Sequence, residues 1–96
     1  MQDLNLLISK AQKGDRQAYG EIYNIFYSRI FRFCKYNVRN EQLAQDICQE
    51  TFLKAWKALP SFQQKGGSLQ AYLFRISRNL IIDHSRKKKE EKIENY

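Results

Sequence analysis

The sequence contains little of what a β-sheet protein, a secreted protein or a metal site requires. It has one proline and four glycines in 96 residues, too few for the many turns that connect β-strands. No apolar run is as long as a membrane span, and the N-terminus lacks a charged-then-apolar signal pattern. These scarcities favour a small all-α domain with one hydrophobic core, cytoplasmic and not inserted in a membrane.

Cysteine and histidine are also scarce, and they do not form a metal-binding pattern. Cys34 and Cys48 lie in two different helical patterns and are not a C-x-x-C pair. A zinc site that included His84, the only histidine, would need a fourth ligand and the close approach of three helices. We therefore expect two buried free thiols and no metal or other cofactor. His84 falls near the apolar stripe of its helix and is expected at the edge of the core, held by a hydrogen bond.

Apolar residues recur at intervals of three and four along four segments, which predicts four helices packed as a small bundle-like domain. The expected helices span residues 4–12, 16–38, 41–59 and 69–89. Residues that favour helix N-caps precede each segment: Asp3, Asp15, Asn40 and Ser68. Gly14 predicts a left-handed stop after the first helix, and Pro60 ends the third. The third and fourth helices are expected to pack through Cys48, Phe52 and Ala55 against Leu73, Ile76 and Leu80.

Aromatic residues widen the apolar arc of the second predicted helix. Tyr23, Tyr27 and Phe31 lie beside the buried stripe, which indicates packing against more than one neighbour. A platform for stacking nucleic-acid bases is the alternative. A stripe of aromatics at helical spacing is more often core, and we favour that interpretation.

The fourth predicted helix is apolar on one side and cationic on the other. Residues 61–89 contain seven basic side chains and one acidic side chain, so +6 of the net charge of +7 lies there. At about 100° per residue, one outer face, here called the cationic face, gathers Arg75, Arg78, Asn79, Ile82, Arg86 and Lys89. A patch of this kind is typical of nucleic-acid binders, and the Asn79 amide can both donate to and accept from a base edge. A merely solvated basic surface is the alternative.

Two further features of the sequence each allow two interpretations. The polar side of the third helix, here called the docking face, carries Asp46, Gln49 and Glu50 around the aliphatic Leu53. An apolar centre ringed by polar groups is typical of a protein-binding hot spot, although lone exposed leucines are common. In the loop PSFQQKGG, residues 60–67, Phe62 either packs into the core or lines a pocket.

Two stretches, DICQETFLKAWKALPSF and SLQAYLFRISRNLIIDHSRKKK, resemble the second conserved region of bacterial sigma factors. The resemblance is to the extracytoplasmic-function group of the sigma-70 family. It rests on a D-x-x-Q-E-x-F run, an S-F pair before a Gly-containing loop, and an R-I-x-R-N-x-x-x-D run, in that order. It covers nearly all of the chain, starting from the KGD turn. Tyr72 stands where the family usually has tryptophan, and the loop is about one residue longer than in some relatives.

The resemblance implies a transcription initiation domain that binds core RNA polymerase and melts the promoter minus-ten element. The docking face, Asp46, Gln49, Glu50 and Leu53, would bind the coiled coil of the polymerase β′ subunit. The loop with Phe62 and the helix with Asn79 would capture a flipped base of the non-template strand. The DNA phosphates would be held by Arg75, Arg78, Arg86, Lys87 and Lys88.

The resemblance also implies a domain division and partners. Residues 1–89 correspond to region 2, and 90–96 to the start of a linker to an absent region 4 domain that would read the minus-thirty-five element. An anti-sigma factor is a usual partner in this group. None of the implied steps needs covalent chemistry, so we do not expect an enzyme.

Two other function classes remain open. A helical DNA-binding regulator would insert a helix-turn-helix in the major groove, but the turn before the basic helix is long and Gly-rich. A protein-interaction module without polymerase binding would explain Leu53, yet it leaves the cationic helix without a partner. Binding to core polymerase separates these classes from a sigma factor.

Overall fold

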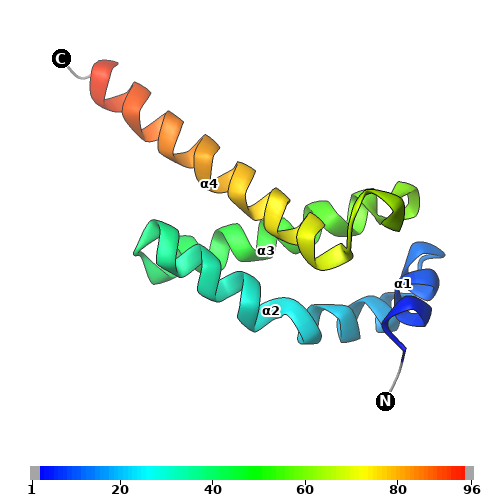
Figure 1. Ribbon diagram of the computed structural model, residues 1–96. Coiled ribbons are helices and arrows are strands. Elements are labelled where there is room, and N and C mark those ends of the chain that lie inside the picture. Colours follow the sequence, from blue (N-terminus) through cyan, green and yellow to red (C-terminus); the bar gives the residue numbers. More distant parts are fainter. Residues whose placement is uncertain (1–2, 95–96) are drawn as a thin grey trace.

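The computed structural model describes residues 3–94, which form four helices (Figure 1). They are α1 (Leu4–Gln12), α2 (Arg16–Val38), α3 (Glu41–Ala58) and α4 (Leu69–Glu94), with two short 3₁₀ turns, η1 (Leu59–Ser61) and η2 (Gln64–Gly66), between α3 and α4. Residues 3–94 contain no strand, so the all-α prediction is confirmed. Within this range, no helix combines the length and apolar character needed to cross a membrane.

Local side-chain chemistry fixes where the helices begin. The Asp15 carboxylate accepts hydrogen bonds from the backbone N–H groups of Gln17 and Ala18 at 3.0 and 3.1 Å. The Ser68 hydroxyl accepts from the Ala71 N–H at 3.1 Å. Each cap satisfies a backbone donor that has no partner inside its helix. Asp3 and Asn40 act in the same way, and all four predicted caps are confirmed.

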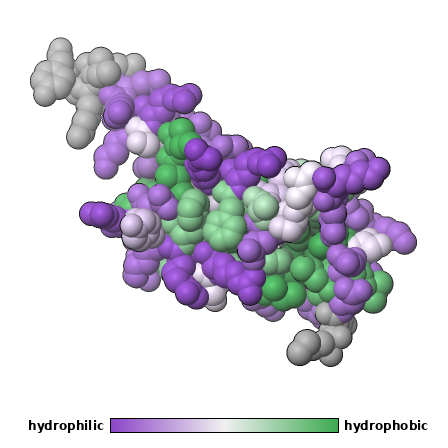
Figure 2. Space-filling view, in the orientation of Figure 1, coloured by the Kyte–Doolittle hydropathy of each residue, from purple (hydrophilic) through white to green (hydrophobic). Residues whose placement is uncertain are grey.

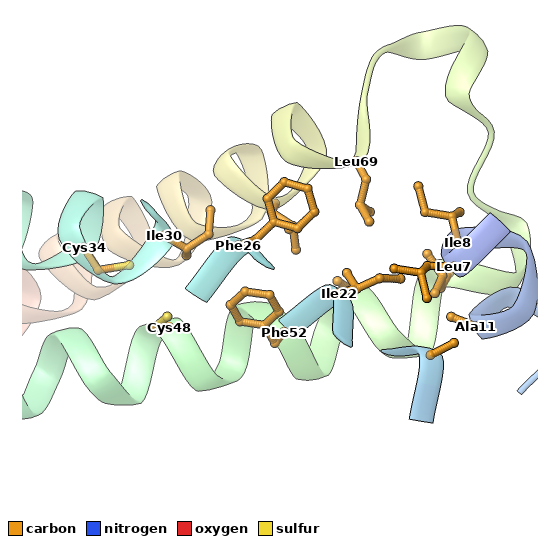
Figure 3. Close-up of a cluster of buried hydrophobic side chains, with 14 of the residues drawn as sticks. Leu7, Ile8, Ala11, Ile22, Phe26, Ile30, Cys34, Cys48, Phe52 and Leu69 are labelled. Carbon is orange, nitrogen blue, oxygen red and sulfur yellow. The ribbon is translucent and has the colours of Figure 1, made fainter. Parts of the chain in front are cut away.

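The core forms where α2 contacts the other three helices. Figure 3 shows the buried side chains of α1, α2 and α3 converging with Leu69, the first residue of α4. From α2 the core takes Ala18, Ile22, Phe26, Ile30 and Cys34; from α3 it takes Ala44, Ile47, Cys48, Thr51, Phe52 and Ala55. The predicted packing of α3 against α4 is present, and Leu73 is buried within it.

The aromatic residues of α2 pack against α3 rather than facing solvent as a platform. The ring of Tyr23 lies 4.7 Å from that of Phe52, and the ring of Tyr19 lies 4.8 Å from that of Trp56, measured between centroids. The Tyr19 hydroxyl donates a hydrogen bond to the backbone carbonyl of Phe52. The interpretation of this stripe as core is therefore confirmed.

Both cysteines are free thiols with no exposed surface, as predicted. Burial raises the pKa of the Cys34 thiol from 9.0 to about 11. Burial, with the neighbouring Cys34, raises the pKa of the Cys48 thiol to about 12. Among the described residues, no three cysteine, histidine or carboxylate side chains come together as metal ligands.

The C-terminal half of α4 leaves the bundle (Figure 1). Every residue from Ile82 to Glu91 is exposed, and Figure 2 shows mainly hydrophilic residues around this protruding end. The prediction that His84 lies at the edge of the core is wrong, because its side chain is exposed in a cleft beside α3. The helix also continues to Glu94 rather than ending at 89, since no proline or glycine interrupts its strong helix formers.

Burial of the two thiols predicts a loss of stability at alkaline pH. In the unfolded chain a thiol loses its proton near pH 9, whereas in the fold it keeps its proton to about pH 11 or 12. The unfolded state therefore binds fewer protons above pH 9, and the free energy of unfolding should fall as the pH rises from 9 to 11. Below pH 9 this contribution is fully present.

Urea denaturation at a series of pH values measures this loss. A chain carrying both Cys34→Ala and Cys48→Ala should lose less stability over the same interval, although it starts from a lower value. An unchanged free energy of unfolding in the wild type between pH 9 and 11 would contradict the raised thiol pKa values.

Candidate nucleic-acid interface

A hollow of ≈ 250 Å³ lies between the end of α3, the loop and the start of α4. We call it the loop hollow. Its aromatic wall consists of Phe62 and Tyr72, whose rings lie 5.1 Å apart at an angle of 32°. Arg75 lies at its edge, and the backbone of Gly66 and Gly67 forms part of its rim. The hollow therefore offers a flat apolar wall, a cation and backbone polar groups.

The loop that shapes this hollow depends on one glycine and on a distant glutamine. Gly67 has φ of +129° and ψ of 175°, a conformation that favours glycine. The side-chain amide of Gln12 donates hydrogen bonds to the backbone carbonyls of Leu59 and Phe62 at 3.1 and 2.8 Å. The sequence pattern does not reveal this contact, because the partners are 47 and 50 residues apart.

The structure brings Phe62 and Arg75 together but leaves Asn79 outside the loop hollow. Phe62 is half-buried: its ring packs against the ring of Tyr72 and also forms a wall of the hollow. Each of the two interpretations, packing inside the protein and lining a pocket, therefore describes part of this side chain. Asn79 is exposed one helical turn after Arg75, about 6 Å further along the axis. Asn79 therefore does not line the loop hollow.

The predicted phosphate-binding residues are all exposed, but they point in different directions. Arg75, Arg78 and Arg86 share the cationic face. Lys87 and Lys88 follow Arg86 at steps of about 100° around the helix.

Lys87 lies in a cleft of ≈ 320 Å³ between α3 and α4, and it shares that cleft with Asp46, Glu50, Asp83 and His84. Lys54 also lines this cleft, so three carboxylates and one further cation lie beside Lys87.

The docking face is exposed as predicted. Leu53 has 53% of its surface accessible, and Asp46, Gln49 and Glu50 are exposed on the same helix. On the other side of Leu53, a shallow hollow of ≈ 310 Å³ is lined mostly by apolar side chains of α2 and α3: Arg16, Tyr19, Phe52, Leu53 and Trp56.

Trp56 is not among the site residues predicted from the sequence. Its position one turn after Leu53 is the signal that could have placed it on this surface.

Comparison with known proteins connects this geometry to one family. The family model described as Sigma-70 region 2 matches residues 22–91. The ECF RNA polymerase sigma factor SigW of Bacillus subtilis is 37% identical over 82 residues, which are 85% of this chain and 43% of SigW. The ECF RNA polymerase sigma factor BldN of Streptomyces coelicolor is 35% identical over 78 residues, 81% of this chain and 30% of BldN. The chain thus spans less than half the length of these relatives.

Two solved structures share the fold. In the RsbN–BldN complex, a chain with 34% identity superposes with a TM-score of 0.77 over 83% of this chain and 58% of that chain. An engineered region 2 of sigmaE, solved in complex with GTAAAA, has a TM-score of 0.82 and 23% identity, and covers 94% of this chain and 93% of that chain. Because the sequence identity is only 23%, the similarity to the sigmaE domain shows a shared fold and nothing further.

The half-buried position of Phe62 predicts a modest cost of truncation. Phe62→Ala should lower the free energy of unfolding by about 1–2 kcal/mol, because part of the ring is already in water. Phe26→Ala, at a fully buried ring on α2, should cost about 3–5 kcal/mol. Urea denaturation of both variants gives the comparison, and equal costs would show that Phe62 is a core anchor rather than a wall.

Proposed function

The chain belongs to the sigma-70 family as a region 2 domain of the extracytoplasmic-function group, and we propose that it opens promoters by capturing the non-template strand of the minus-ten element while bound to core RNA polymerase. The observation that carries the proposal is the loop hollow, walled by Phe62 and Tyr72 and continuous with Arg75 of the cationic face. An aromatic wall beside a row of cations is the arrangement that binds single-stranded nucleic acid.

Strand capture needs no covalent chemistry. Extruding a base from the duplex costs a few kcal/mol, and stacking it on an aromatic ring returns about 1–3 kcal/mol. Phe62 and Tyr72 supply the stacking surface, and Arg75 lies where it can bind the adjacent phosphate or the base edge. Arg78 and Arg86 extend the positive charge along α4, so the captured strand is held while its partner separates.

Sequence discrimination and phosphate binding belong to different side chains in this proposal. Arg78 contributes a charge that attracts any sequence, whereas the Asn79 amide can tell one base edge from another. Because Asn79 lies about one turn beyond the loop hollow, it reads a nucleotide next to the captured one. The engineered sigmaE region 2, which has the same fold, was solved in complex with GTAAAA.

The docking face serves the second part of the proposal, attachment to the β′ coiled coil of polymerase. Leu53 would be the desolvated centre, with Asp46, Gln49 and Glu50 as its polar surround. The apolar hollow beside it, lined by Trp56 and Tyr19, enlarges the surface available to a partner helix. A protein partner of the anti-sigma type is also proposed, and the related BldN chain was solved in a complex with RsbN.

Binding of single-stranded DNA should separate these roles. The ligands are a strand selected from a randomised single-stranded pool and its scrambled form. With about four phosphates neutralised, the slope of log affinity against log salt should be near −3. Arg78→Ala should weaken binding to both strands equally, and Phe62→Ala and Asn79→Ala should weaken mainly the selected strand. Lys10→Ala, at an exposed lysine of α1, is the control; equal losses on both strands for Asn79→Ala would remove it from the reading site.

Leu53→Asp tests the docking face. An unpaired carboxylate in the buried part of the contact should cost several kcal/mol of polymerase binding, yet it should barely change the melting temperature. Ile25→Asp, at a similarly exposed aliphatic residue of α2, is the matched control. The measurements are a thermal melt, a pull-down with core polymerase and oligonucleotide binding. Unchanged polymerase binding by Leu53→Asp would contradict the docking assignment, and no polymerase binding by the wild type would favour the regulator or interaction-module alternatives.

A further inference from the structure

The side chain of Gln12, the last residue of α1, crosses to the loop between α3 and α4. Its Nε2 donates to the backbone carbonyls of Leu59 at 3.1 Å and Phe62 at 2.8 Å. Only the nitrogen of an amide can donate to a carbonyl, so these two acceptors determine which end of the amide faces the loop. Both amide hydrogens are used.

The two carbonyls lie at either end of η1, and they differ in the other hydrogen bonds that they accept. The Leu59 carbonyl also accepts from the Phe62 N–H at 3.0 Å, which closes the turn. At Phe62 the backbone becomes extended, with φ of −69° and ψ of 134°. Within residues 3–94, Gln12 is the only donor to the Phe62 carbonyl. The amide therefore sets the direction of the chain at the residue whose ring walls the loop hollow.

Helix α1, which carries Gln12, is itself packed into the core. Leu7, Ile8 and Ala11 are buried beneath it, and Figure 1 shows α1 at the same end of the molecule as the loop. A second hydrogen bond joins α1 to the loop: the Gln64 side-chain amide donates to the Asn5 side-chain carbonyl at 3.2 Å. By contrast, the loop residues Gln63 to Ser68 are exposed and bury nothing of their own.

We infer that Gln12 is a positioning residue, through which α1 holds the loop in the conformation that accepts a base. This inference rests on the proposed function of the loop hollow. Helix α1 carries none of the residues proposed to touch DNA or polymerase, so its contribution is preorganisation. A loop that is already ordered does not lose further conformational entropy when the strand binds.

Gln12→Met tests the inference, because methionine keeps the length and helix propensity of glutamine but has no donor. Amide exchange of residues 61–67 should become faster. The affinity for the selected strand should fall roughly three- to tenfold, because the loop must then be ordered when the strand binds. The affinity for the scrambled strand, set by phosphate contacts, should not change. Gln17→Met, at an exposed glutamine of α2, is the matched control.

Gln12→Glu adds a readout that a merely structural role would not change. The ionised carboxylate can only accept, and it would face two carbonyl oxygens. Once protonated, the same group can donate to one of them. Burial and the facing carbonyls should raise the pKa of the introduced carboxyl above its ordinary value of about 4.3. The ratio of selected to scrambled affinity should therefore rise in this variant as the pH falls from 7 to 5, while the wild-type ratio stays level.

The outcomes distinguish this inference from the proposed function. Wild-type exchange rates for residues 61–67 in Gln12→Met, or equal losses on both strands, would overturn the positioning role. The absence of any pH-dependent recovery in Gln12→Glu would also count against it. If the wild type itself shows no strand preference, the proposed function fails, and the exchange rates still decide whether Gln12 orders the loop.

Discussion

The burial of one side of α2 is the constraint on which the rest of the structure depends. Ile22, Phe26 and Ile30 form a continuous stripe along this helix, and α2 contacts α1, α3 and α4. Because α2 occupies the centre, each of the other helices buries one side against it and leaves the opposite side in solvent. The docking face of α3 and the cationic face of α4 are those free sides, so the two candidate binding surfaces follow from the way the core is filled.

The docking face and the loop hollow differ in chemistry, and different parts of the structure hold them in place. Leu53 is an aliphatic group on a helix that packs against both α2 and α4, which suits a rigid contact with another protein. The loop hollow instead depends on a short exposed segment whose shape comes from Gln12 and from the glycine conformation at Gly67. In the proposed function, recognition of a base thus depends on hydrogen bonds from the Gln12 side chain of α1, a helix that does not line the hollow.

The sequence predicts the features whose causes are local. Caps such as Asp15 and Ser68 act on backbone groups two or three residues away, and the 3.6-residue period identifies the buried side of each helix, so helices, core and exposed Leu53 were predictable. Periodicity does not say where along a helix its neighbour ends. For that reason the exposure of His84 and the distance of one helical turn between Asn79 and the loop hollow were not predictable. The Gln12 contact depends on tertiary packing and leaves no pattern in the sequence.

The burial of Cys34 and Cys48 has a consequence for how the domain meets oxidants. Peroxides and electrophiles attack the thiolate, not the thiol. With a pKa of about 11 for one group and about 12 for the other, almost none of either is ionised at neutral pH, and neither has surface that a reagent could reach. We therefore expect neither thiol of the folded domain to react readily with oxidants, and both cysteine sulfurs act as packing atoms of the core.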